Sequence, residues 1–144
     1  MTEDEELAKI RERKMQELIR RSQQPEVREP LSKGTVEHLT EQNFWSTLKK
    51  TNIALVDFFA EWCGPCKALT PIFQRLAQDY KGEAFLAKID IDRNQRAAQQ
   101  FGVQSVPMVV VFKNGEPVGR LPGLRTYNDY SSIIERLLKQ ESSE

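Results

Sequence analysis

The sequence has few cysteine and histidine residues, which bind metal ions or form the disulfides of small secreted domains. Its 144 residues include two cysteines and one histidine, so a closed zinc site of four Cys or His ligands would need carboxylates or a second subunit. The cysteines, Cys63 and Cys66, are three positions apart, and a disulfide that closes so short a loop contributes little stability. We therefore expect no metal site, and a chain of this length needs no disulfide framework to fold.

The chain also lacks an excess of either charge and any long apolar run. Its 21 basic and 21 acidic residues balance, which gives no general electrostatic reason to bind nucleic acid or an anionic membrane. The longest apolar runs, at residues 53–60 and 106–112, are far shorter than the roughly 20 residues that span a membrane. The opening MTEDEE is acidic, where a secretory signal would be basic and then apolar. We expect a cytoplasmic protein, in which a CxxC pair is more often catalytic or metal-binding than structural.

The composition changes at about residue 34. Residues 1–24 are dense in charge, and their apolar residues recur at helical period, which predicts an amphipathic N-terminal helix or arm. Residues 25–34 contain two prolines and a glycine without periodicity and are interpreted as a linker. Residues 35–140 form the expected globular domain, and residues 141–144 a tail.

Within residues 35–140 the patterns of strands and helices alternate in the order βαβαβαββα. This order predicts an α/β fold with a mixed central β-sheet, parallel in its middle and antiparallel at its end, flanked by helices on both faces. The expected strands are 35–39, 53–59, 84–91, 107–112 and 117–121, the last two joined as a hairpin by a turn at Asn114-Gly115. The first expected helix is capped by Thr40, and the second runs from the cysteines to about Tyr80 with Pro71 inside it. A third helix is expected at 94–101, and a last one begins with a capping box of Thr126 and Asp129.

The cysteines lie in the sequence Cys63-Gly64-Pro65-Cys66, where a buried strand is predicted to pass into a helix. The N-terminus of a helix carries partial positive charge, which favours a thiolate. Pro65 suits a first helical turn, and Gly64-Pro65 sets a tight geometry in which the two sulfurs can close and reopen. The pattern predicts a reversible redox pair, with Cys63 as the exposed nucleophile and Cys66, one turn deeper, as the resolving thiol.

The segment VDFFAEWCGPCKALTP, residues 56–71, resembles the active-site signature of the thioredoxin family. The resemblance covers about residues 35–140 and is carried by Asp57, WCGPCK at 62–67, Pro71, Lys88, Val106-Pro107, KNGE at 113–116 and Gly123. It implies a thioredoxin fold and a redox carrier that reduces protein disulfides through Cys63 and Cys66, without a prosthetic group. The implied partners are disulfide-containing target proteins and a thioredoxin reductase, and we expect a monomer.

The resemblance also assigns supporting roles around the cysteines. Asp57, a carboxyl in an otherwise apolar strand, is expected to have a raised pKa and to accept the proton of Cys66. Lys88 is expected to pair with Asp57 and tune its proton affinity.

The remaining assignments concern the substrate and the single histidine. Val106-Pro107 is expected to be a cis bond opposite the cysteines that leaves a backbone edge free for an extended substrate. Trp62 and Gly123 are expected to line the same groove. His38 is interpreted as a surface residue of a short strand.

Residues 4–18, DEELAKIRERKMQEL, lie outside this resemblance. They resemble the opening helix of the programmed-cell-death-five-like family, small proteins linked to nucleic-acid and chaperone partners. Two interpretations stay open: a solvated, partly formed helix, or a docking arm that folds on a partner. The second gives the alternative function, a thioredoxin-fold adaptor that recruits a partner through its N-terminal arm.

Overall fold

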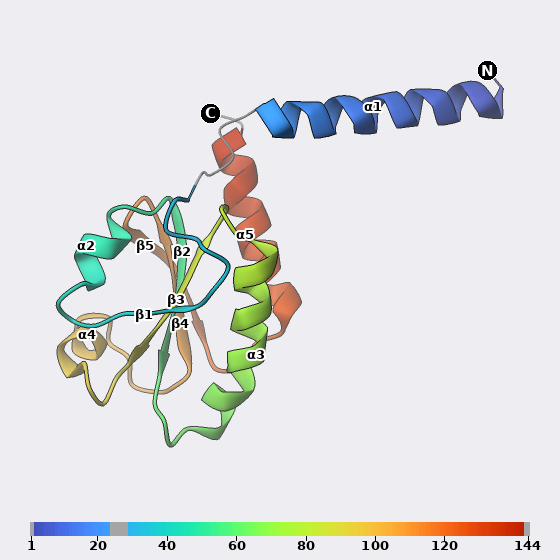
Figure 1. Cartoon of the computed structure of the whole chain (residues 1–144). Helices are drawn as coiled ribbons and strands as arrows, with labels where there is room; N and C mark the ends of the chain where they lie inside the picture. The colour runs from blue at the N-terminus through green and yellow to red at the C-terminus, as the bar shows by residue number, and fades with distance from the viewer. Residues whose placement is uncertain (1, 24–28, 143–144) are drawn as a thin grey trace.

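The computed structural model describes residues 2–23 and 29–142, and its elements after residue 35 follow the predicted order βαβαβαββα (Figure 1). The elements are α1 (Glu3–Gln23), β1 (Glu37–His38), α2 (Phe44–Leu48), β2 (Ile53–Phe59), α3 (Gly64–Asp79), β3 (Phe85–Asp90), α4 (Gln95–Gln100), β4 (Met108–Lys113), β5 (Glu116–Pro122) and α5 (Tyr127–Ser142).

The five strands form one mixed sheet in the order β1-β3-β2-β4-β5. Strand β3 pairs in parallel with β1 and β2, whereas β4 pairs antiparallel with both β2 and β5. Helices α3 and α5 lie together beside the sheet, and α2 and α4 lie on its opposite side (Figure 1). The predicted fold class, a mixed sheet with helices on both faces, is confirmed.

Strand β2 lies at the centre of the sheet, and its first six residues are all buried. Ile53 and Leu55 pack among side chains of α3 and α5, whereas Ala54 and Val56 pack among side chains of α2 and α4. Because successive side chains of a strand alternate between faces, Asp57 belongs to the face that α3 and α5 cover.

Local signals in the sequence set several of the boundaries. Asn114 and Gly115 have φ angles of 53° and 80°, the left-handed pair that a tight primed turn between β4 and β5 requires. The backbone N–H of Asp129 donates to Thr126 Oγ1, and that of Thr126 donates to Asp129 Oδ2, so the predicted capping box opens α5. The predicted cap at Thr40 is wrong, because α2 begins only after Asn43, whose Oδ1 accepts from the Thr40 N–H at 2.8 Å.

Part of the segment interpreted as a linker is packed against the domain. Glu29 is fully buried, and its Oε1 accepts hydrogen bonds from the backbone N–H groups of Asn52 and Ile53 at the start of β2. The hydroxyl of Ser32 donates to the carbonyl oxygen of Ala84 at 2.6 Å. Residues 29–32 therefore hold the starts of β2 and β3. Residues 24–28 lie outside the described part of the chain.

Helix α1 differs from the other helices because every side chain from Thr2 to Ile19 is exposed. Its exposed apolar side chains are Leu7, Ile10, Met15, Leu18 and Ile19. None of the helices in the described part of the chain is long and apolar enough to cross a membrane.

The contacts of Glu29 and Ser32 predict where the chain can be shortened. Deleting residues 1–27 should leave the free energy of unfolding within about 0.5 kcal/mol of the full chain, because the side chains of residues 2–19 are all exposed and the buried Glu29 and Ser32 are kept. Deleting residues 1–33 should lower it by about 2–4 kcal/mol, because the Asn52 and Ile53 N–H groups lose their acceptor. Urea unfolding of the two truncations measures the difference, and equal stability of both would contradict the fastening role of residues 29–32.

Candidate active site

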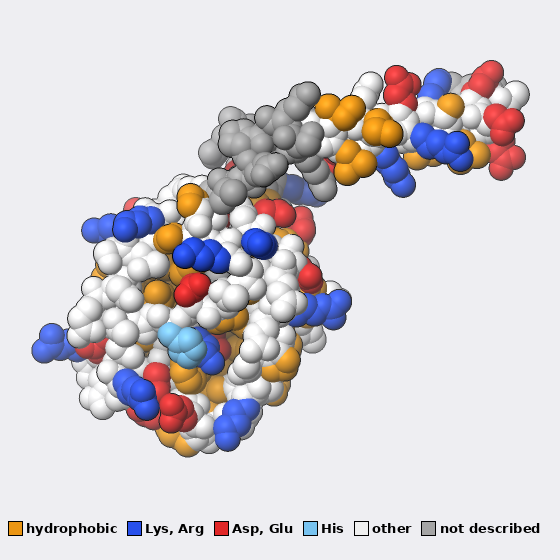
Figure 2. Space-filling view, in the orientation of Figure 1, with side chains coloured by type: hydrophobic (Ala, Val, Ile, Leu, Met, Phe, Trp, Pro, Cys, Tyr) orange, Lys and Arg blue, Asp and Glu red, His pale blue; other side chains and the backbone are white. Residues whose placement is uncertain are grey.

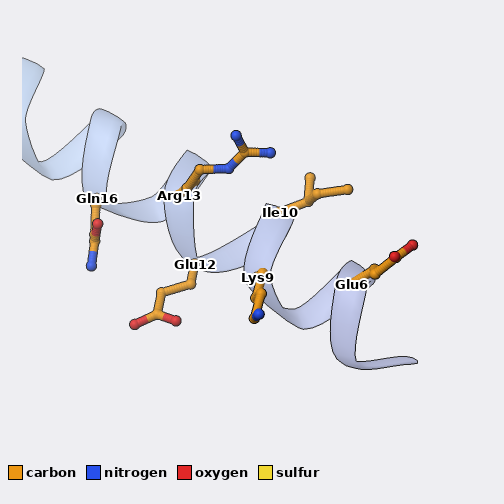
Figure 3. A pocket seen from close by; sticks show the side chains of 6 residues that line it. All are labelled: Glu6, Lys9, Ile10, Glu12, Arg13 and Gln16. Atoms are coloured by element: carbon orange, nitrogen blue, oxygen red, sulfur yellow. The ribbon is translucent and has the colours of Figure 1, made fainter. Parts of the chain in front are cut away.

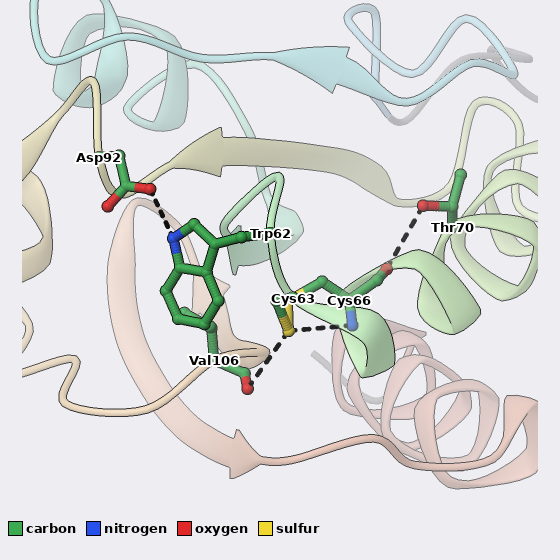
Figure 4. Close-up of a disulfide and its surroundings, with 6 residues drawn as sticks. All are labelled: Trp62, Cys63, Cys66, Thr70, Asp92 and Val106. Atoms are coloured by element: carbon green, nitrogen blue, oxygen red, sulfur yellow. Dashed lines mark hydrogen bonds between the residues drawn. A yellow bond between two sulfur atoms is a disulfide. The ribbon is translucent and has the colours of Figure 1, made fainter.

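Cys63 and Cys66 meet at the junction of β2 and α3 and form a disulfide, with their Cα atoms 5.3 Å apart (Figure 4). Cys63 is the N-cap residue of α3, and its Sγ accepts a hydrogen bond from the Cys66 backbone N–H at 3.2 Å. Pro65 occupies the first turn, as predicted. A Cβ at position 64 would have no heavy atom within 4 Å, so Gly64 borders open space.

The expectation of an exposed Cys63 is not met in this disulfide state. The exposed fraction of Cys63 is 5%, against 3% for Cys66. Both lie in a small apolar cluster with Ala60, against which Phe59 and Val106 pack. The two thiols therefore differ in their position on the helix rather than in exposure, because only Cys63 caps the first turn.

A second segment approaches the disulfide from the start of β4. The Val106-Pro107 bond is cis, as expected, and the carbonyl oxygen of Val106 lies 3.7 Å from Cys63 Sγ (Figure 4). The carbonyl oxygen of Pro107 accepts from the Gly123 N–H at 2.8 Å. Trp62 is 71% exposed, and its Nε1 donates to Asp92 at 2.8 Å, which fixes the ring beside the cysteines.

Asp57 is 2% exposed, and its Oδ1 has no hydrogen-bond partner. Burial raises the pKa of the Asp57 carboxyl to about 7, and the positive charge of Lys88 opposes part of that rise. A carboxyl with this pKa can take up or release a proton near neutral pH.

Lys88 is the register neighbour of Asp57 on β3, and its Nζ lies 4.7 Å from the centroid of the Phe59 ring. Among the described side chains no salt bridge of 4 Å or less joins Lys88 to Asp57. Lys88 thus affects the pKa of Asp57 through its positive charge and not through a direct salt bridge.

Two adjoining cavities, of about 300 and about 320 Å³, run between β1 and α3 beside Asp57. Both are lined by His38, Asp57, Thr70 and Lys88, and the second also reaches Cys66. We call this space the β1–α3 groove. It links the deeper cysteine, the buried carboxyl and the molecular surface.

Sequence reasoning missed three polar side chains near the cysteines. The Thr70 hydroxyl donates to the carbonyl oxygen of Cys66 at 3.4 Å, and Asp92 accepts from Trp62. His38 was assigned to the surface, where it does lie, but it also pairs in register with Lys88. The spacing of four residues from Cys66 on one helix would have indicated Thr70. The positions of Asp92 and His38 near the site could be inferred only from the order of the strands in the sheet.

A larger depression lies along α1 and is not a candidate site. Its side chains all come from one helix and radiate from it without converging (Figure 3). They are those of Glu6, Lys9, Ile10, Glu12, Arg13 and Gln16. In the described parts of the chain no group of three His, Cys, Asp or Glu residues is placed to hold a metal ion.

The buried carboxyl predicts how stability changes with pH. The pKa of Asp57 is about 7 in the folded chain against 3.8 for an ordinary aspartate, so its contribution to stability is complete below about pH 4 and is lost as the pH rises through 7. At pH 8, the free energy of unfolding of Asp57→Asn should therefore exceed that of the parent by up to about 4 kcal/mol, with little difference at pH 4. Urea unfolding at both pH values measures this difference. Asp4→Asn on exposed α1 is the control, and a pH-independent difference for Asp57→Asn would contradict the raised pKa.

Comparisons with known proteins agree with this geometry. The sequence model of the thioredoxin family matches residues 35–136. Thioredoxin of Staphylococcus saprophyticus is 41% identical over 100 residues, which cover 69% of this chain and 95% of that protein, and thioredoxin of Staphylococcus haemolyticus is 39% identical over the same shares.

Solved structures give the same result. A point mutant of thioredoxin from Halobacterium salinarum superposes with a TM-score of 0.68 at 33% identity, over 72% of this chain and 91% of that one. The long form of thioredoxin f from spinach chloroplast superposes with a TM-score of 0.69 at 28% identity, over 76% and 91%. With a cysteine pair at the N-terminus of α3, the chain belongs to the thioredoxin family and is a thiol–disulfide oxidoreductase that reduces disulfides.

Proposed function

We propose that Cys63 is the thiol that attacks protein disulfides and that Cys66 is the thiol that resolves the resulting intermediate. The observation that carries this assignment is the position of Cys63 as N-cap of α3, where its sulfur already accepts the Cys66 N–H. A thiolate at this position gains both that hydrogen bond and the partial positive charge of the helix end. Cys66 lies inside the first turn and lacks this stabilisation.

The proposed reaction is two successive thiol–disulfide exchanges. The Cys63 thiolate attacks one sulfur of the target disulfide, forms a mixed disulfide and releases the other target sulfur as a thiolate. Cys66 then loses its proton and attacks Cys63 Sγ, which releases the second target sulfur and forms the Cys63–Cys66 disulfide seen here. Two electrons pass to the target, and a thioredoxin reductase then supplies two further electrons that restore the Cys63 and Cys66 thiols.

Asp57 is proposed to accept the proton that Cys66 loses. Both residues line the β1–α3 groove, and the Asp57 Oδ1 has no competing hydrogen bond. Its pKa of about 7 suits a group that takes a proton from a thiol and gives it up again near neutral pH. Lys88 tunes this affinity through its positive charge.

The proposed substrate surface surrounds the mouth of the disulfide. The Val106 carbonyl faces Cys63, so an extended target segment can pair with the backbone before Pro107. The exposed ring of Trp62 and the open backbone at Gly123 flank this position, because a Cβ at 123 would meet no heavy atom within 4 Å. Gly64 and Pro65 are proposed to tune the redox potential through the geometry of the turn.

The partners that follow are disulfide-containing proteins and a thioredoxin reductase, and we propose that the protein acts as a monomer. The cytoplasm is the proposed location, because a compartment that keeps thiols reduced preserves the dithiol form. Reduction of insulin by dithiothreitol, followed by turbidity, tests the function. Acceleration supports it, whereas no acceleration with both cysteines intact would favour an adaptor that recruits partners through α1.

The different roles proposed for the two cysteines predict that their serine variants trap target proteins to different extents. Cys66→Ser should accumulate a covalent complex with a disulfide-containing protein, because Cys63 attacks and no thiol resolves the product. Cys63→Ser should trap little, since Cys66 lacks the N-cap position that stabilises a thiolate. Non-reducing gels measure both variants, and equal trapping, or more by Cys63→Ser, would reverse the assignment.

The role of Asp57 predicts a pH-dependent loss of rate. Asp57→Asn should slow the resolution step about tenfold or more near pH 7, where the parent carboxylate can accept the Cys66 proton. The loss should shrink at higher pH, where hydroxide and buffer bases can take the proton in place of Asp57. The rate at which the mixed disulfide decays, followed by quenching with an alkylating reagent, measures it. The same pH profile for variant and parent would remove Asp57 from the mechanism.

A further inference from the structure

Asp57 must pass its proton onward before it can serve again, and its own surroundings offer few acceptors. The carboxyl is 2% exposed, and its Oδ1 donates or accepts no hydrogen bond. The β1–α3 groove is the space that joins it to the surface. Its two cavities, of about 300 and about 320 Å³, are each wide enough for several water molecules at about 30 Å³ per molecule.

His38 stands at the outer end of this groove. Its side chain is exposed, and its register neighbour on β3 is Lys88, which in turn neighbours Asp57 on β2. Side chains in register on adjacent strands point to the same face of a sheet, so these three lie in one row across the face that α3 covers. Figure 2 shows the single histidine on the surface of the domain, beside a basic side chain.

The His38 ring is held in this place by an aromatic contact. Its centroid lies 6.4 Å from that of Phe59, and the two planes meet at 82°. Lys88 Nζ lies over the same Phe59 ring. Phe59 therefore supports both basic side chains at the mouth of the groove.

We propose that His38 receives the proton that Asp57 takes from Cys66 and delivers it to solvent through water in the β1–α3 groove. This inference rests on the proton-acceptor role proposed for Asp57. The proton leaves the Cys66 thiol, resides on the Asp57 carboxyl, crosses the groove to the neutral imidazole and departs to bulk water. No electron moves in these proton transfers; Asp57 and His38 return to their starting states, and Cys66 is left as the thiolate that attacks Cys63.

The charges around His38 favour the neutral imidazole, which is the form that can accept a proton. Partial burial and the Lys88 ammonium lower the pKa of the imidazole, whereas Glu37 raises it in part. Asp57, Glu61 and Lys67 line the same cavity as His38. A lowered pKa keeps the imidazole neutral at pH 7, so one ring nitrogen is free to take a proton.

The test follows the decay of the mixed disulfide after the reduced protein is mixed with insulin in dilute buffer at pH 7. His38→Ala should slow this decay roughly three- to tenfold, less than the hundredfold or more of a group that acts on the reacting sulfur itself. Added imidazole should restore the rate of His38→Ala and leave the parent unchanged. The parent keeps the only histidine of the chain, so a rate that imidazole raises in His38→Ala but not in the parent shows that imidazole acts in place of His38.

Two variants separate proton transfer from the shape of the groove. His38→Gln should lose as much rate as His38→Ala but resist rescue, because the amide fills the space and does not titrate. Gln74→Ala, which widens the same groove without removing a titratable group, should keep the parent rate. Thermal unfolding establishes that each variant is folded.

The outcomes distinguish this inference from the function on which it rests. If the mixed disulfide of His38→Ala decays at the parent rate while that of Asp57→Asn decays slowly, His38 does not relay the proton and the role of Asp57 stands. A slow His38→Ala that imidazole does not restore would indicate a packing role and also overturns the relay. If neither variant changes the decay, the proton-acceptor role of Asp57 fails as well.

Discussion

A carboxyl group that is buried in the central strand, next to a redox-active cysteine, is the constraint on which the site depends. Strand β2 is buried because it has a neighbour on each side and helices on both faces. An apolar residue at position 57 would suit that environment better than Asp57, because a buried carboxyl whose Oδ1 has no hydrogen-bond partner is costly. The protein tolerates this cost, and in return it holds a group whose pKa lies near 7.

The fold brings three separate elements to this carboxyl. Helix α3 starts where β2 ends, which places Cys63 at the positive helix end and Cys66 above the groove. The segment before β4 places the Val106 carbonyl 3.7 Å from Cys63 Sγ. Strand β3 places Lys88 beside Asp57 in register. In the proposed mechanism, the helix end stabilises the thiolate, the backbone before Pro107 pairs with the substrate and the groove carries the proton.

Features that depend on a few neighbouring residues were predictable from the sequence. The cysteine pair at a strand-to-helix junction, the Asn114-Gly115 turn and the capping box at Thr126 all follow from local conformational preferences. The cis bond at Pro107 came from the family resemblance, since the low frequency of cis X-Pro bonds would by itself favour a trans bond. Features that depend on distant contacts were not predictable. Residues 29–34 have the composition of a linker, yet Glu29 is fully buried because it accepts two N–H groups from the start of β2. His38 looks isolated along the chain and gains its neighbours only through the pairing of β1 with β3.

The most direct test of this account is the titration of the Asp57 carboxyl carbon by nuclear magnetic resonance, in protein labelled at aspartate and assigned by its loss in Asp57→Asn. In the disulfide state the account predicts a midpoint near pH 7, because burial outweighs the field of Lys88. A midpoint near about 4, the ordinary value for aspartate, would mean that the carboxyl is fully ionised at neutral pH. It would then be no proton reservoir for Cys66, and the central claim would be contradicted.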